Sequence, residues 1–144
     1  MKRWFRCVGF ILAISMLLAV PALAAENATP RASDYIMRTC VYLNQTSSTQ
    51  FDVWHEVIAL GIMDELGAYK IRIQESTDGS SWTTVYTFTA DEVPSMVEQD
   101  SHVHVGSVSY TGVSGRYYRA KITMFAENST GRGEVITYTE TLRL

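Results

Sequence analysis

Residues 69–82 have the sequence YKIRIQESTDGSSW. Apolar residues at 69, 71 and 73 alternate with polar residues at 70, 72 and 74, and this period of two predicts a β-strand with one buried and one exposed face. The Asp78-Gly79 pair predicts a tight reverse turn, because glycine accepts the positive φ that such a turn requires. The stretch therefore predicts a β-hairpin whose return strand begins at Trp82.

The rest of the chain from Glu26 onward has the composition of strands, because it is rich in threonine, serine, valine and tyrosine. We expect seven strands, at 35–43, 51–63, 69–74, 82–89, 102–110, 117–126 and 134–142. Turns are expected at 44–49, 64–67, 112–115 and 128–133, and one helical turn at 95–98. Seven short antiparallel strands predict a single all-β domain at 34–144, an immunoglobulin-like antiparallel β-sandwich.

The N-terminal segment has the three parts of a secretion signal. Lys2, Arg3 and Arg6 form a short basic region, residues 8–20 are almost wholly apolar, and PALAA at 21–25 supplies small residues for cleavage. The apolar run is about a dozen residues, shorter than the roughly 20 that a membrane-spanning helix needs. We expect a signal peptide at 1–25, a flexible leader at 26–33, a secreted protein and no stable membrane insertion after cleavage.

The net charge of the chain after removal of the signal limits the classes of partner that we expect. Removing the three basic residues of the signal from the twelve in the chain leaves nine, against fifteen acidic residues, which is a net charge of −6. No basic cluster is visible in the remaining sequence. Nucleic acids and anionic membrane surfaces are therefore not expected as partners.

Cysteine is scarce. Cys7 leaves with the signal and Cys40 then stands alone, so no disulfide can form within the domain. A buried apolar role for Cys40, an intermolecular disulfide and a reactive thiol all stay open.

Two motifs resemble fibronectin type III domains. AENSTGRG at 126–133 matches the A-x-N-x-x-G-x-G pattern common at the end of the sixth strand, and STDGSSW at 76–82 matches the S-x-D-G-x-x-W of the hairpin. The resemblance implies a sandwich of that kind. The family's tyrosine is expected six residues before Ala126, where this chain has Ala120, while Tyr118 lies two residues earlier. Whether Tyr118 makes the family's corner hydrogen bond stays open.

The chain also resembles a family of small secreted proteins of unknown function from Gram-positive anaerobic bacteria. The matching residues are 61–69, Trp82 and 107–118. The resemblance covers most of the chain after the signal. It implies secretion and a sandwich, and it carries no activity.

Histidines give the candidate metal site. His102 and His104 are two residues apart on an expected strand, so their imidazoles share one face and are candidates to bind zinc or copper. The alternative is a polar strand face, and because two ligands without a third define no metal site, no cofactor is expected. His55 and Glu56 point to opposite faces, so a structural histidine is expected there rather than a catalytic pair. No nucleophile elbow, phosphate loop or C-x-x-C is present, and no enzyme activity is expected.

Aromatic residues give the candidate ligand-binding surface. If Tyr118 faces the core, Tyr117 and Phe125 face outward on the same strand, and Trp82 follows the nearby hairpin turn. Exposed aromatic rows bind sugars by stacking or anchor partner proteins. The alternative is ordinary cross-strand packing. Further aromatic residues are expected to add to one surface or the other: Tyr42, Trp54, Tyr86 and Tyr138.

The sequence thus predicts a secreted, non-enzymatic binding or interaction protein whose ligand is an extracellular glycan, a cell-envelope component or a protein. A structural subunit of a surface assembly is the second hypothesis. A secreted metal-dependent enzyme using His102 and His104 is the third. The oligomeric state stays open.

Overall fold

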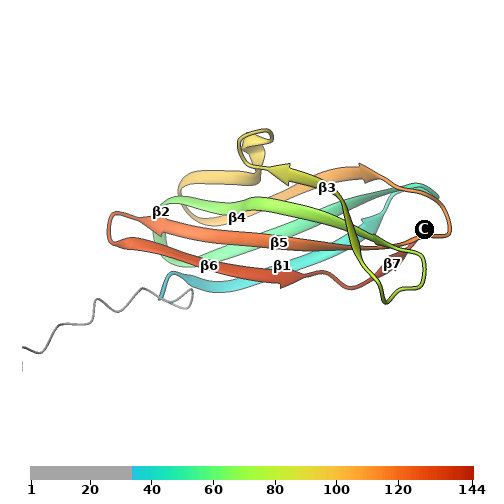
Figure 1. Cartoon of the computed structure of the whole chain (residues 1–144). Helices are drawn as coiled ribbons and strands as arrows, with labels where there is room; N and C mark the ends of the chain where they lie inside the picture. Colours follow the sequence, from blue (N-terminus) through green and yellow to red (C-terminus); the bar gives the residue numbers. More distant parts are fainter. Residues whose placement is uncertain (1–33) are drawn as a thin grey trace, which may run out of the picture.

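The computed structural model describes residues 34–144. The predicted signal peptide at 1–25 and leader at 26–33 lie outside the described residues. Within 34–144 no helix has the length and apolar character needed to cross a membrane. The described chain is all-β, with the 3₁₀ turn η2 (Pro94–Met96) between two of its strands (Figure 1). Its strands are β1 (Ile36–Gln45), β2 (Gln50–Ser76), β3 (Thr83–Thr89), β4 (Val97–Thr111), β5 (Tyr117–Asn128), β6 (Gly131–Tyr138) and β7 (Leu142–Arg143).

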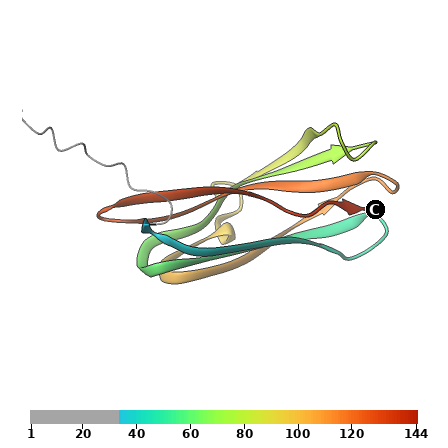
Figure 2. The same ribbon diagram turned by 90° about the horizontal axis from the view of Figure 1, so that it is seen from below.

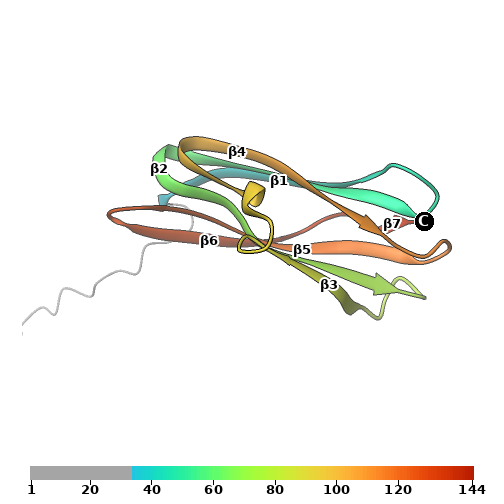
Figure 3. The same cartoon turned by 90° about the horizontal axis from the view of Figure 1, so that it is seen from above.

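The strands form a seven-stranded antiparallel sheet organised around β2, so the predicted all-β antiparallel fold is confirmed. β1 pairs with the first half of β2, and most of β4 pairs along its other edge. β3 and β5 pair with the second half of β2, and β6 and β7 pair with β5. The sheet is partly curled, so that β1 and β4 lie on one side of the molecule and β5 and β6 on the other (Figures 2 and 3).

The core lies inside this curl. Alternate residues of β2 and β5 fill it, as the period of two requires. The fully buried side chains include Phe51, Val53, Val57, Ile71 and Ile73 from β2 and Tyr118, Ala120, Ile122 and Met124 from β5. The intervening residues of β5 therefore point outward.

The hairpin predicted from residues 69–82 is confirmed. β2 and β3 pair in antiparallel register from Lys70 opposite Thr89 to Glu75 opposite Thr83. In the turn, an Asp78 carboxylate oxygen accepts hydrogen bonds from the backbone N–H groups of residues 80 and 81, both at 2.8 Å. Gly79 has the positive φ expected of it, 74°. Local turn chemistry thus sets the register of this pair.

The turn predicted at 64–67 is wrong, because β2 runs through it. Residues 65–67 keep ladder pairs with 97–99 of β4 and with 125–127 of β5. Leu66 and Ala68 are fully buried, so leaving the ladder would expose apolar side chains. Gly67 permits close approach of the backbone at the end of η2, because a Cβ at this position would clash with the Met96 carbonyl oxygen. The predicted last strand at 134–142 also differs, since β6 ends at Tyr138 and the short β7 follows.

Candidate functional site

The side chains that alternate with the core residues of β5 make a second, outward surface. Cross-strand register adds residues of the same orientation from the second half of β2 and from β6. Ring contacts add Trp82 and Arg143. We call this surface the outer face; it comprises Lys70, Arg72, Gln74, Trp82, Tyr117, Arg119, Lys121, Thr123, Phe125, Arg132, Glu134, Ile136, Tyr138 and Arg143.

The outer face gathers the positive charge of an acidic chain. Residues 34–144 hold eight Lys and Arg residues against fourteen Asp and Glu residues, and six of those eight belong to the outer face. They are Lys70, Arg72, Arg119, Lys121, Arg132 and Arg143. The sequence shows no basic cluster because these residues come from four strands. Sheet pairing brings them together.

Arg119 occupies the centre of this surface, between two aromatic rings. Its guanidinium carbon lies 4.4 Å from the centre of the Trp82 ring and 5.0 Å from that of Tyr138. Its Nε–H donates to Gln74 Oε1 at 2.8 Å. Within residues 34–144, no acceptor or carboxylate pairs with its two terminal nitrogens. The plane of the guanidinium is therefore fixed while its outer N–H edge stays open.

Arg72 and Lys121 lie beside Arg119. They are direct partners across β2 and β5, so two positive charges face each other on one side of the sheet. Lys121 Nζ is 5.6 Å from the Tyr138 ring, and no carboxylate of the described chain forms an ion pair with either residue. Like charges placed directly opposite destabilise a sheet. This part of the outer face therefore lacks an intramolecular counter-charge.

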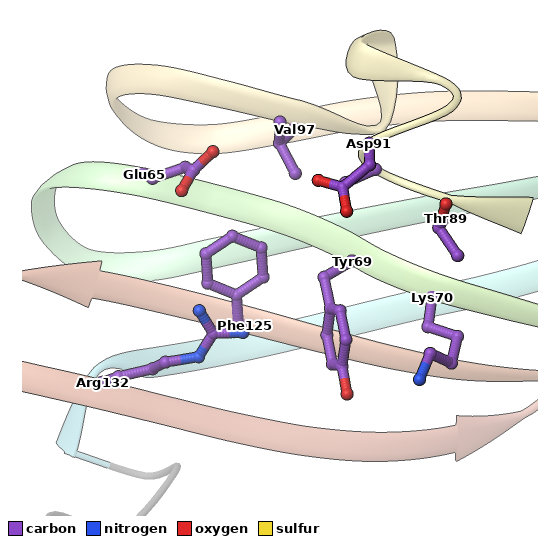
Figure 4. A pocket seen from close by; sticks show the side chains of 9 residues that line it. Glu65, Tyr69, Lys70, Thr89, Asp91, Val97, Phe125 and Arg132 are labelled. Atoms are coloured by element: carbon purple, nitrogen blue, oxygen red, sulfur yellow. The ribbon is translucent and has the colours of Figure 1, made fainter.

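The other end of the outer face holds a pocket of about 370 Å³ (Figure 4). Its lining is Glu65, Tyr69, Lys70, Thr89, Ala90, Asp91, Val97, Phe125 and Arg132. A register irregularity between Ala68 and Lys70 allows Tyr69 to join this lining beside Phe125, at 6.4 Å between ring centres. The pocket is mixed in charge, since acidic and basic side chains both line it.

Arg132 has the same kind of stacking as Arg119 but a different electrostatic state. Its guanidinium carbon lies 4.0 Å from the centre of the Phe125 ring. Its nitrogens contact Glu127 at 3.0 Å and Glu134 at 2.9 Å. Both charged edges of Arg132 are thus satisfied internally, and its role here is to cover Phe125.

The three candidate ligand-binding residues all lie on the outer face. Trp82 and Tyr117 are half-buried, with Arg119 and Arg143 over their respective rings. Phe125 is only 2% exposed, because Arg132 covers it. Tyr138 joins them, while Tyr42 and Trp54 stack at 4.8 Å between ring centres on β1 and β2. Cations cover ring faces of the outer surface, which sequence periodicity alone does not reveal.

The histidines pair differently from the sequence prediction. His104 is buried against His55, with their Nε2 atoms 3.3 Å apart, whereas His102 is exposed. His102 lies where the β2–β4 register shifts between Ile58 and Met63, and it has no ladder partner there. Among residues 34–144 no three or more metal-ligating side chains cluster.

Burial decides the charge state of the His55–His104 pair. Desolvation by burial and, to a smaller extent, the nearby His104 together lower the pKa of His55 to about 4. Burial also lowers the pKa of His104, although Glu98, 4.0 Å from its Nδ1, acts against this. Two neutral rings can share one N–H···N hydrogen bond. Gly106 makes room for it, since a Cβ there would lie 2.8 Å from both Nε2 atoms.

Cys40 is exposed on β1, so its buried apolar role is excluded. It lies opposite Glu56, which forms a 2.7 Å ion pair with Arg38. This surface faces away from the core on the opposite side of the molecule from the outer face. It carries no comparable group of cations among the described residues.

Comparisons with protein-family models, with curated proteins and with solved structures found no match to this chain. The outer face and the buried histidine pair are therefore the features from which function is argued. The outer face is open to solvent, and the histidine pair is not.

Proposed function

We propose that this protein is a secreted, non-enzymatic binding protein whose ligand site is the outer face. The observation that carries the proposal is Arg119, held between Trp82 and Tyr138 with its terminal N–H groups open. Ordering a long side chain before binding lowers the entropy that binding costs. Arg and Trp are also the side chains that contribute most at binding surfaces.

The proposal includes an immunoglobulin- or fibronectin type III-like sandwich. The pairing of β1, β2 and β4 on one side and of β3, β2, β5 and β6 on the other supports it. So does Tyr118, whose hydroxyl oxygen accepts a 2.8 Å hydrogen bond from the Val113 N–H at the β4–β5 corner. A tyrosine that bonds back to the backbone a few residues upstream marks this corner in such sandwiches.

Export determines which classes of ligand the protein can meet. The basic, apolar and small-residue segments at 1–25 support secretion, and so does the resemblance to small secreted Gram-positive proteins. A secreted protein meets the polysaccharides of cell envelopes and of the surrounding medium. We therefore propose a glycan ligand, with a cell-envelope protein as the alternative.

A glycan array that includes cell-wall polysaccharides tests this proposal. We expect saturable binding that Trp82→Ala weakens and that Tyr42→Ala, on the opposite surface, leaves unchanged. Near-ultraviolet circular dichroism verifies that both variants are folded. Binding that depends on Tyr42 instead of Trp82, or no binding by folded protein, would contradict the proposal.

A further inference from the structure

We infer that the ligand of the outer face is an anionic polysaccharide, and that Arg72, Arg119 and Lys121 bind its carboxylate or phosphate groups. The inference rests on the proposed function and names the substrate class of the same site. The protein has a net negative charge, yet on the outer face three basic residues, Arg72, Arg119 and Lys121, form no ion pair with a carboxylate of residues 34–144.

The Arg72–Lys121 pair supports an anionic ligand. Facing like charges destabilise the free protein, and no carboxylate among residues 34–144 offsets this pair. Like charges that face each other with no nearby carboxylate to offset them break a general rule of sheet stability, and such exceptions are expected at functional sites. An anionic group bound over both residues would supply the missing counter-charge.

The open N–H edge of Arg119 also supports an anionic ligand. With Nε bonded to Gln74 and the plane fixed by Trp82 and Tyr138, the two terminal nitrogens are presented in a planar fork. This fork matches the two oxygens of a carboxylate or phosphate. A neutral sugar would instead stack on an open ring, and cations cover ring faces of Trp82 and Tyr138.

The shape of the charged row favours a polymer. The basic residues extend along β5 from the level of Lys70, opposite Thr123, to that of Arg143, opposite Tyr117. Six residues of strand span about 20 Å. The ligand is therefore a chain of linked sugars lying along β5, and a single acidic sugar would contact only part of the row.

Nucleic acid fits these observations less well. The fourteen acidic residues within 34–144 would repel a densely charged phosphate backbone. Bases bind single-strand sites by stacking on open aromatic rings. Here Phe125 is buried and Arg119 covers one face of Trp82.

Two matched pairs of polymers test the inference on the full chain by biolayer interferometry. Polygalacturonate is compared with its fully methyl-esterified form, and phosphomannan with neutral mannan, at 50 and 200 mM NaCl. We expect at least one charged polymer to bind about tenfold or more tightly than its neutral match, and more weakly at high salt. The polymer that binds identifies carboxylate or phosphate as the recognised group.

Variants locate the site. Arg119→Gln and Arg119→Lys should each weaken binding to the charged polymer about tenfold, because lysine keeps the charge but loses the fork. Arg72→Gln, at a side chain without internal partners in the described chain, should weaken it about threefold without affecting folding. Arg38→Gln removes the same charge from the opposite surface and should leave the affinity unchanged within twofold.

The alternative outcomes are distinct. Equal affinity for charged and neutral polymers, lost in Trp82→Ala, would overturn the inference and keep the proposed function. No binding to any polysaccharide would overturn both. Tighter binding of single-stranded DNA with the same Arg119 dependence would overturn the inference in favour of nucleic acid. Unchanged binding in Arg119→Gln and Arg72→Gln would remove these residues from the site.

Discussion

Arg72 and Lys121 face each other directly across β2 and β5, and no carboxylate within residues 34–144 forms an ion pair with either one. Sheets ordinarily place opposite charges or uncharged residues at such positions, because facing like charges repel. The free protein is therefore less stable than it would be with opposite charges or uncharged residues at these two positions. Arg72 and Lys121, together with Arg119, are available to a ligand because no internal carboxylate neutralises them.

Reversing the charge at Arg72 should raise the stability of the protein and abolish ligand binding. In Arg72→Glu the new carboxylate faces Lys121, and a repulsive cross-strand pair becomes an attractive one. We expect the free energy of unfolding to rise by about 0.5 kcal/mol and the midpoint of thermal unfolding by about 2–4 °C. Binding to the ligand of the outer face should be lost. Arg72→Gln, which only removes the repulsion, should give about half the gain; a loss of stability in Arg72→Glu would contradict the account.

The buried histidine pair predicts a specific pH dependence. The folded protein holds the pKa of His55 at about 4, below its ordinary value of 6.5. The unfolded chain therefore binds the extra proton first, and stability falls as the pH drops from 6.5 towards 4, by up to about 3 kcal/mol. Urea unfolding between pH 7.5 and 4 measures this loss.

Variants of the histidines isolate that effect from the titration of carboxylates. His55→Gln should flatten the slope of stability against pH, whatever its stability at pH 7. His102→Gln, at an exposed position, should keep the slope of the unmodified protein. The same slope in both variants would show that His55 does not titrate as described.

Gly106 gives a steric test of the same pair. A Cβ at this position would lie 2.8 Å from the Nε2 atoms of His55 and His104, so one or both rings must move. Gly106→Ala should reduce the free energy of unfolding by about 1–3 kcal/mol. Gly61→Ala is the matched control, since a Cβ there meets no atom within 4 Å. Equal urea midpoints for the two variants would be inconsistent with the close packing.

Tyr118 tests the corner between β4 and β5. Its hydroxyl accepts a hydrogen bond from Val113 and donates one to Glu75, and burial together with Glu75 raises the pKa of Tyr118 to about 12. Tyr118→Phe keeps the ring in the core and removes both bonds, which should cost about 2 kcal/mol. Tyr117→Phe, on the outward side of the strand, should change stability by less than about 0.5 kcal/mol. Chemical denaturation distinguishes them, and an unaltered Tyr118→Phe would mean that the corner bonds contribute nothing net.

Sequence periodicity predicts the parts of the fold that depend on neighbours in the chain. The alternation at 69–74 and the Asp78-Gly79 turn predict the β2–β3 hairpin, and the alternation of β5 places Tyr118 inside and Tyr117 outside. The turn at 64–67 is mispredicted because acidic residues and a glycine resemble a reverse turn. Only the tertiary ladder with β4 and β5 keeps this segment extended.

The candidate site depends on register between strands that are distant in sequence. Arg72 meets Lys121, and His55 meets His104, only because β2 pairs with β5 and β4 at those positions. One signal was available: His55 lies between Val53 and Val57 in a run whose alternate residues are apolar, which indicates a core position. The sequence does not indicate its partner, since a shift of one residue would turn each side chain to the other face.

The most direct test of the central claim is to map the ligand onto the protein by nuclear magnetic resonance. Amide chemical shifts of the ¹⁵N-labelled protein are followed as oligogalacturonate and, separately, phosphomannan oligosaccharide are added. The account predicts that shift changes gather on the outer face, at residues 70–74 of β2, 117–125 of β5 and 136–138 of β6, and that they disappear in Arg119→Gln. Changes centred on Tyr42 and Trp54 of the opposite surface, or no changes with either oligosaccharide, would contradict it.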